Sequence, residues 1–148
     1  MMKRLIACAT LLVLLSPLVL AEPEVIEPDP IPTVNAGLNR ADGYTRELWV
    51  GLPSASVGGK ELLTSMTANA PATTSVAVIA KSKQDTATRR VQLQNTLTKL
   101  RASVGPKQYV RTVLLGVGES CNDAIWLAES DSEIRNVVLI DPPVAGLT

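Results

Sequence analysis

Hydrophobic and polar positions change their period several times along the chain, between the alternation of strands and the three- or four-residue spacing of helices. Near the middle, every second residue shares one face and Trp49 points to the other, which predicts a strand over 46–52. The shared face holds Leu48, Val50 and Leu52. Later runs are continuously apolar, as expected of strands covered on both faces of a parallel sheet. These runs are 76–80, 113–116 and 137–140.

Helical spacing fills the intervals between those runs. A weak apolar stripe follows Gly58-Gly59 and stops before Pro71, which predicts a short helix. Its members are Leu62, Leu63 and Met66. A stronger helix is predicted after Asp85, a residue type that caps helices, and Gly105-Pro106 ends it. Its stripe consists of Leu93, Leu97, Leu100 and Val104, and a third, short helix covers 124–128.

The order of these elements predicts the fold class. Apolar strands joined by helices form consecutive βαβ units, and such crossovers are how parallel strands are connected. Right-handed crossovers place the helices on the faces of the sheet. We therefore predict an α/β fold, a three-layer sandwich around a small, mostly parallel sheet of about four strands, carried by residues 45–148.

The first 44 residues differ in composition from this domain. Lys3 and Arg4 precede an apolar stretch that is shorter than a membrane span and ends at Ala21, the layout of a secretory signal over residues 1–21. Residues 22–44 begin with a segment rich in proline and acids, which predicts an extended linker. The predicted location is the periplasm or the exterior, with cleavage after Ala21.

The charge and the residue types of the chain limit the classes of partner and cofactor that we expect. The signal takes two of the 14 basic residues and none of the 14 acidic ones, so the remaining chain is slightly acidic, and we expect neither nucleic acid nor a membrane as partner. Cys8 leaves with the signal, and Cys121 then has no cysteine to pair with. With no histidine in the chain, we expect no metal site and no cofactor.

The turn after the 113–116 run carries the candidate chemistry. Gly116 and Gly118 permit a tight turn, and Ser120, Cys121 and Asn122 open the next helix, whose free N–H groups favour an anion or an oxyanion. The same residue types also occur in an ordinary βα turn that binds no ligand, and this is the first alternative. A dinucleotide site is a further alternative, with Asp141 closing the next strand and Cys121 standing at the third glycine of that motif.

Residues 107–143 resemble the middle of an α/β-hydrolase, with a strand, a Gly-x-Ser turn, a helix and a strand that ends in Asp-Pro. The resemblance extends back to the 76–80 strand and is closest to an uncharacterised group of exported proteobacterial hydrolase-like proteins. It implies that Ser120 is the nucleophile, that the Cys121 N–H is half of an oxyanion hole and that Asp141 is the acid.

The chain departs from the hydrolase pattern at several points. It has no histidine to serve as the base, Asn122 replaces the second glycine, and no His-Gly follows the 46–52 strand. Loss of a triad member costs about 10⁴- to 10⁶-fold in rate, so we expect a non-catalytic binding or structural protein. The alternatives are a serine hydrolase whose base is Lys81, Lys83 or a partner's histidine, or a piece of a longer hydrolase. In the last case, an exposed sheet edge predicts a homodimer.

Overall fold

The computed structural model describes Val25, residues 46–104 and residues 111–144, and within them it shows a sheet of four parallel strands in the order β2-β1-β3-β4. The strands are β1 (Glu47–Leu52), β2 (Thr74–Val78), β3 (Arg111–Val117) and β4 (Ile134–Ile140). The connecting elements are α2 (Gly59–Asn69), α3 (Thr86–Val104), the 3₁₀ turn η3 (Gly118–Ser120) and α4 (Cys121–Ser130). The predicted α/β sandwich with a small parallel sheet is confirmed.

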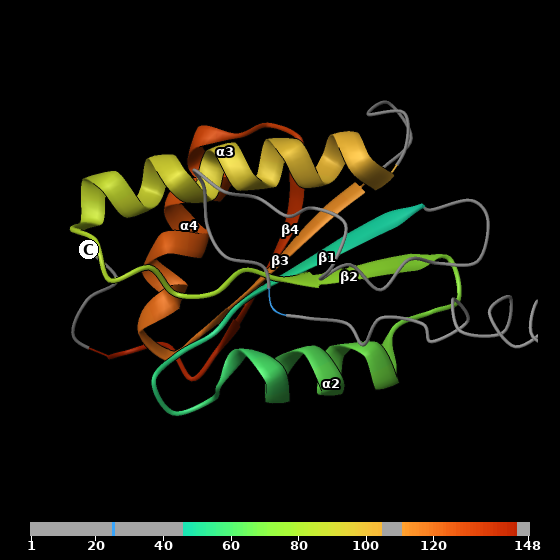
Figure 1. Ribbon diagram of the computed structural model, residues 1–148, viewed down its shortest axis with the longest axis horizontal. Helices are drawn as coiled ribbons and strands as arrows, with labels where there is room; N and C mark the ends of the chain where they lie inside the picture. The colour runs from blue at the N-terminus through green and yellow to red at the C-terminus, as the bar shows by residue number, and fades with distance from the viewer. Residues whose placement is uncertain (1–24, 26–45, 105–110, 145–148) are drawn as a thin grey trace, which may run out of the picture.

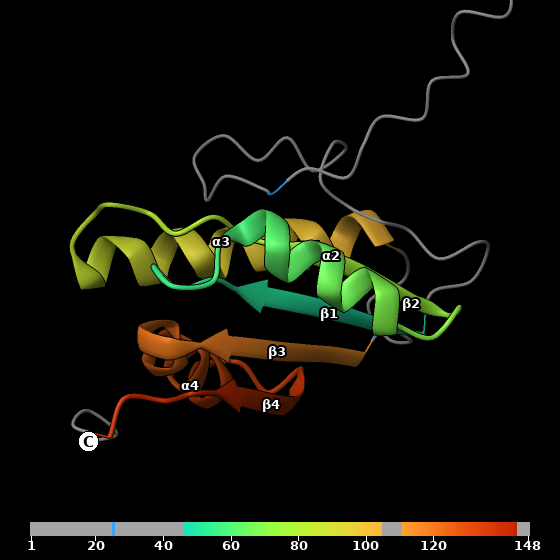
Figure 2. The same ribbon diagram turned by 90° about the horizontal axis from the view of Figure 1, so that it is seen from below.

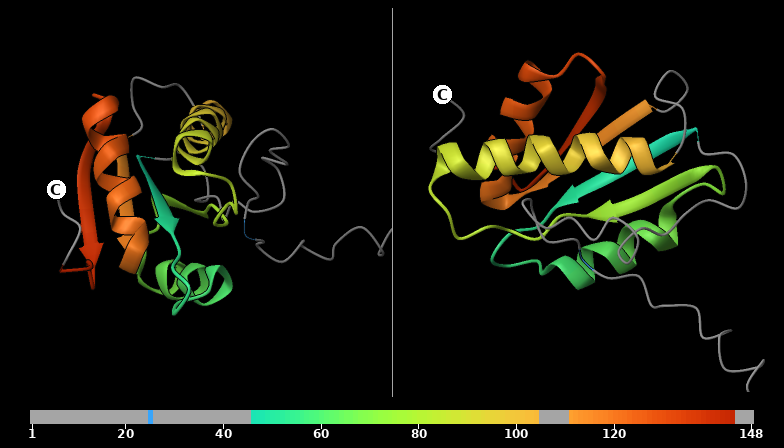
Figure 3. Two further views of the ribbon diagram at one scale, coloured as in Figure 1. Left: turned by 90° about the vertical axis from the view of Figure 1, so that its left-hand side faces the viewer. Right: turned by 45° about the horizontal axis from the view of Figure 1, so that its top comes forward.

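The sheet lies between two helical layers, with α2 on one face and α3 and α4 on the other (Figure 1). Seen from the side in Figure 3, the two layers enclose the strands. Leu48, Val50 and Leu52 belong to the core under α3 and α4, whereas Trp49 packs against the core under α2. The predicted division of β1 into two faces is therefore correct, and it places apolar side chains in both cores.

Helix α2 packs closely on β1 because Gly51 leaves room for it. A Cβ atom at Gly51 would lie 2.7 Å from the Met66 sulfur and 2.8 Å from a Leu62 methyl group. Leu62, Leu63 and Met66 are all buried, as their spacing predicts. The absence of a side chain at Gly51 thus fixes how near the helix can approach the sheet.

Helix α3 begins with the predicted cap. The Asp85 carboxylate accepts hydrogen bonds from the Thr88 N–H and from the Thr88 hydroxyl, at 3.1 and 2.6 Å. The apolar stripe then buries Leu93, Leu97 and Leu100 against β1 and α4. Capping and periodicity agree in this segment, and the helix spans 86–104.

The three strands predicted from apolar runs all begin before their runs. Strands β2 and β3 begin two residues early, at Thr74 and Arg111, and β4 begins three residues early, at Ile134. The start of β4 contains the polar Arg135 and Asn136, and its pairing with β3 is irregular there, since Thr112 pairs with Ile134 and Val113 with Asn136. A polar edge segment with a bulge has no apolar run to reveal it.

The predicted signal, residues 1–21, lies outside the described residues, and so does the linker over 22–44 except for Val25. The Val25 side chain packs against the core under α2, where a Cβ atom at Gly59 would lie 2.9 Å from it. None of the described helices combines the length and the apolar character that crossing a membrane requires.

Candidate functional site

The loops after β1 and β3 meet at one point on the carboxyl edge of the sheet. The two strands are paired neighbours, but the helix that follows β1 covers one face and the helix that follows β3 covers the other. The two connections therefore diverge, and in open α/β sheets such a divergence forms the crevice where ligands bind. The candidate turn at 116–122 lies on one side of this crevice and the loop from Pro53 to Gly58 on the other.

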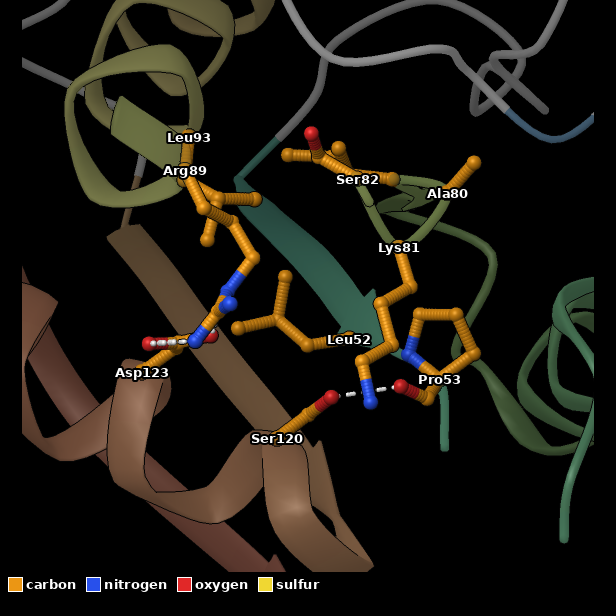
Figure 4. A pocket seen from close by; sticks show the side chains of 10 residues that line it. Leu52, Pro53, Ala80, Lys81, Ser82, Arg89, Leu93, Ser120 and Asp123 are labelled. Atoms are coloured by element: carbon orange, nitrogen blue, oxygen red, sulfur yellow. Dashed lines mark hydrogen bonds and ion pairs between the residues drawn. The ribbon is translucent and has the colours of Figure 1, made fainter. Parts of the chain in front are cut away.

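The Ser120 hydroxyl is buried and already bonded. Its Oγ lies 2.5 Å from the carbonyl oxygen of Pro53, to which it donates, and the residue is 5% exposed (Figure 4). The backbone of Ser120 is helical, with φ −75° and ψ −7°, at the junction between η3 and α4. The hydroxyl proton thus joins two loops, and its acceptor is a neutral carbonyl rather than a base.

The left-handed position of the turn belongs to Gly118. Its φ is +55°, two residues before Ser120, and a Cβ atom there would lie 3.1 Å from the Ser54 Cβ. A nucleophile elbow places the serine itself on the strained turn, so that its hydroxyl stands exposed above the sheet. Here a glycine takes the strained position, and the serine follows it in relaxed helical geometry.

Three N–H groups near Ser120 are engaged in internal hydrogen bonds. The Cys121 N–H donates to the Gly118 carbonyl, and the Ser54 N–H donates to the Val57 carbonyl at 3.2 Å. The Ala55 N–H donates to the Glu119 carboxylate at 3.0 Å. An oxyanion hole needs donors aimed at an empty position, and these three donors are aimed at oxygen atoms of the protein.

Gly116 and Cys121 hold α4 against β3. A Cβ atom at Gly116 would lie 2.9 Å from both the Cys121 Cα and the Ala124 Cβ. The Cys121 thiol donates to the Gly116 carbonyl at 3.2 Å and is buried, and its burial raises the pKa of the thiol. In a dinucleotide-binding motif, the third glycine allows the helix to pack closely on the strand. In this chain Gly116, the first glycine of the turn, has that role, and Cys121 packs against it.

Neither Asp141 nor Asn122 is the partner of the Ser120 hydroxyl, which donates to the Pro53 carbonyl. Asp141 follows β4 with φ +51° and an exposed side chain, and within residues 46–104 and 111–144 it forms no hydrogen bond with Ser120. Asn122 is half-buried on α4. The turn therefore brings Gly116, Gly118, Ser120 and Cys121 together, while the predicted acid stands at the end of the neighbouring strand.

A small cleft opens beside Ser120, between β1, the segment after β2, and the first turns of α3 and α4 (Figure 4). Its walls include Leu52, Pro53, Lys81, Arg89, Ser120 and Asp123. The space measures about 230 Å³ including the part that opens to solvent. Pockets for small-molecule ligands occupy roughly 300 to 1,000 Å³, so this cleft is small for such a ligand.

The charges around the cleft are paired. Arg89 donates through Nε and Nη2 to the buried Asp123 carboxylate at 2.7 and 3.3 Å, and Arg90 donates to it at 3.3 Å. Lys81 contacts Glu119 at 2.6 Å. Arg89 and Arg90 share one acidic partner, Asp123, which lies more than 30 positions away, so the spacing of the sequence gives no signal of this pairing.

The pairing with Lys81 makes Glu119 the basis of a pH-dependent prediction. The hydrogen bond from Lys81, aided by the N–H groups of Glu119 and Ala55, lowers the pKa of the Glu119 carboxyl from 4.5 to about 2. A lowered folded-state pKa stabilises the fold above pH 4.5, and this contribution is lost as the pH falls toward 2. Because the carboxylate is 45% exposed, Glu119→Gln should cost less than about 1 kcal/mol at pH 7.

Urea unfolding at pH 7, 4 and 2.5 measures this contribution. The difference in unfolding free energy between wild type and Glu119→Gln should shrink as the pH falls. A difference that is constant over this range would contradict the pairing of Glu119 with Lys81.

Within the described residues, no group of three cysteine, aspartate or glutamate side chains is placed to hold a metal ion. The chain matches no protein-family model, no curated protein and no solved structure. The site's own geometry is therefore the basis for assigning a function.

Proposed function

We propose that the protein is an exported, non-catalytic member of the α/β-hydrolase type that acts by binding a partner. The observation that carries this proposal is the hydrogen bond from the Ser120 hydroxyl to the Pro53 carbonyl. A serine nucleophile needs a base that accepts its proton, and the carbonyl of a peptide bond cannot take that role. Ser120 instead connects the loop after β1 to the start of α4.

The surroundings of Ser120 support the same proposal. The left-handed glycine at position 118 stands two residues before the serine, and the nearby N–H donors are used within the protein. A hydrolase without its histidine retains only oxyanion stabilisation and binding. With these three donors occupied, oxyanion stabilisation is weakened as well, and substrate binding is the contribution that would remain.

The cleft argues for a partner that binds on the surface of the protein. Its volume is below the usual range for small ligands, and its cations are paired with carboxylates. It therefore offers neither the usual room for a small-molecule ligand nor the unbalanced positive charge that would attract an anion. Export rests on the basic, apolar and small residues of the predicted signal over 1–21.

Hydrolysis of short-chain esters tests the proposal. The purified protein and its Ser120→Ala variant should both hydrolyse a 4-nitrophenyl ester at the rate of the buffer blank. Activity in the wild type that disappears in Ser120→Ala would overturn the proposal. The folded state of both samples is checked by the cooperativity of their urea unfolding.

Ser120→Ala should affect stability rather than rate. Removing the hydroxyl leaves the Pro53 carbonyl without that donor, which costs about 1–3 kcal/mol for a buried group. The matched control is Ser130→Ala, whose exposed hydroxyl donates to the Trp126 carbonyl at the far end of α4. The control should cost less than about 0.5 kcal/mol. Equal unfolding free energies for wild type and Ser120→Ala would show that the buried bond contributes nothing.

A serine hydrolase with a lysine base is the second candidate, because Ser120 and Lys81 line the same cleft. Its chemistry requires a neutral Lys81 and a free Ser120 hydroxyl. The Lys81 Nζ is already engaged in an ion pair with the Glu119 carboxylate, and the Ser120 hydroxyl already donates to the Pro53 carbonyl. If ester hydrolysis occurs and Lys81→Ala abolishes it, this candidate replaces the first.

A further inference from the structure

The outer edge of β4 is apolar and, among residues 46–104 and 111–144, pairs with no strand. Val138, Leu139 and Ile140 are 44%, 36% and 42% exposed. Edge strands in proteins are usually protected by charges, prolines or a covering segment, because an open edge binds other strands. Here the four residues from Val137 to Ile140 carry no charge or proline, and in the part of the chain that the structure describes no strand pairs with this edge.

The exposed side chains lie on both faces of the sheet. Val138 pairs with Leu115, and Ile140 pairs with Val117, so both point to the face that carries α2. Helix α2 packs on β1 and β2, and β4 stands at the outer margin beyond it (Figure 2). Leu139 points to the opposite face, toward α4. A strand added at this edge would cover apolar atoms on both faces at once.

The regularly paired part of β4 is bounded on both sides, and Val138 lies at its centre. On one side, the irregular pairing with β3 sets Arg135 out of the ladder. On the other side, Asp141 takes a left-handed backbone conformation, and Pro142 follows it. The undisturbed segment is therefore 136–140, with Val138 at its centre and opposite charges just beyond its two ends.

We propose that β4 pairs with β4 of a second copy of this chain, antiparallel, across a two-fold axis at Val138. In this register Val138 faces Val138 of the partner subunit, and Val137 faces Leu139 of the partner subunit. Just beyond the paired segment, Arg135 lies at the same end as Asp141 of the partner subunit, and this juxtaposition occurs twice because the interface is two-fold symmetric. A parallel pairing would instead place the two Arg135 side chains side by side. The strand is thus complementary to itself in charge as well as in shape.

The size of the interface sets its expected strength. One short strand pair buries less surface than a standard protein–protein interface, so we expect a dissociation constant on the order of 1–100 µM. Sedimentation equilibrium of the purified protein over this concentration range should show a monomer–dimer equilibrium. A monomer at every concentration, or assemblies that keep growing beyond the dimer, would overturn the proposal.

Cysteine cross-linking tests the register. Directly opposed residues of antiparallel strands have Cα atoms about 4.5–5.5 Å apart, which suits a disulfide. Val138→Cys should therefore form a covalent dimer in air. Asn136→Cys, on the same face of the same strand, should not, because its counterpart would lie about 13 Å away along the strand. Cys8 is replaced by serine in both variants and in the parent chain, and buried Cys121 provides little background, which that parent chain measures. Cross-linking of Asn136→Cys in place of Val138→Cys would exclude this register.

Charged variants test the contact without new cysteines. Val138→Lys places two ammonium groups opposite each other and should raise the dissociation constant at least about tenfold. Val91→Lys is the matched control, since Val91 is 55% exposed on α3 and lies away from this edge. Arg135→Glu should also weaken the dimer, and adding Asp141→Lys to it should restore the dimer. Equal effects of Val138→Lys and Val91→Lys, or no restoration by the double change, would contradict the proposed pairing.

Discussion

Replacing Gly116 with valine should prevent α4 from packing on β3 and should lower the free energy of unfolding by more than about 3 kcal/mol. The first added carbon would already lie 2.9 Å from the Cys121 Cα, and the two methyl groups of valine extend further. A backbone atom cannot rotate away as a flexible side chain can. Since domains are stable by only about 5–15 kcal/mol, this loss would be a large fraction of the total stability.

Urea unfolding followed by tryptophan fluorescence measures this effect. Gly116→Ala should fall between wild type and the valine variant, at a cost of about 1–3 kcal/mol, because its single carbon meets the same atoms. The matched control is Gly58→Ala, where an added Cβ would meet no atom within 4 Å and φ is −65°. Its cost should stay below about 1 kcal/mol. Equal stability of Gly116→Val and wild type would contradict the close approach of α4 to β3.

The second large effect is expected at Arg101. This buried cation contacts the start of β3, at the end of the sheet opposite the candidate turn. Its guanidinium is 5% exposed, donates from Nε to the Thr112 hydroxyl at 2.9 Å, and binds the Asp131 carboxylate through Nη1 at 2.5 Å. Asp131→Ala removes the principal counter-charge, and only the half-exposed Glu133 remains at 3.4 Å. Leaving a buried charge without its partner costs about 3–5 kcal/mol, and we expect the lower part of that range.

A double variant distinguishes the cost of leaving the Arg101 charge unpaired from the cost of losing the ion pair itself. Arg101→Met combined with Asp131→Ala removes both partners, and it should be more stable than Asp131→Ala alone, because no buried charge remains. Glu133→Ala should cost less than about 1 kcal/mol, since its side chain is 51% exposed. A double variant that is less stable than the single Asp131→Ala would show that Arg101 is held by its packing rather than by its ion pair.

Much of the fold follows from local patterns in the sequence. The alternation at 46–52, the apolar runs and the cap at Asp85 each depend on neighbouring residues, and the structure has the corresponding strands and helix. The residues of β2, β3 and β4 that precede the apolar runs are polar except for Ile134, and in β4 the ladder is also irregular at Arg135. The local sequence therefore locates the apolar middle of each strand better than its first residues.

The candidate site could be predicted only in outline. The two glycines predict a tight turn, but either of them can adopt a positive φ, so the sequence does not show that Gly118 takes it. The acceptor for the Ser120 hydroxyl is Pro53, 67 positions away. Contacts over such a separation depend on the strand order, which puts the ends of β1 and β3 side by side.

Fluorophosphonate labelling is the most direct test of the central claim that Ser120 is a structural residue. Such a probe forms a covalent bond only with a serine whose hydroxyl is activated. The purified, folded protein should remain unlabelled, and so should Ser120→Ala, while an active serine hydrolase in the same tube is labelled fully. Labelling of the wild type that Ser120→Ala abolishes would show that Ser120 is a nucleophile and would contradict the proposed function.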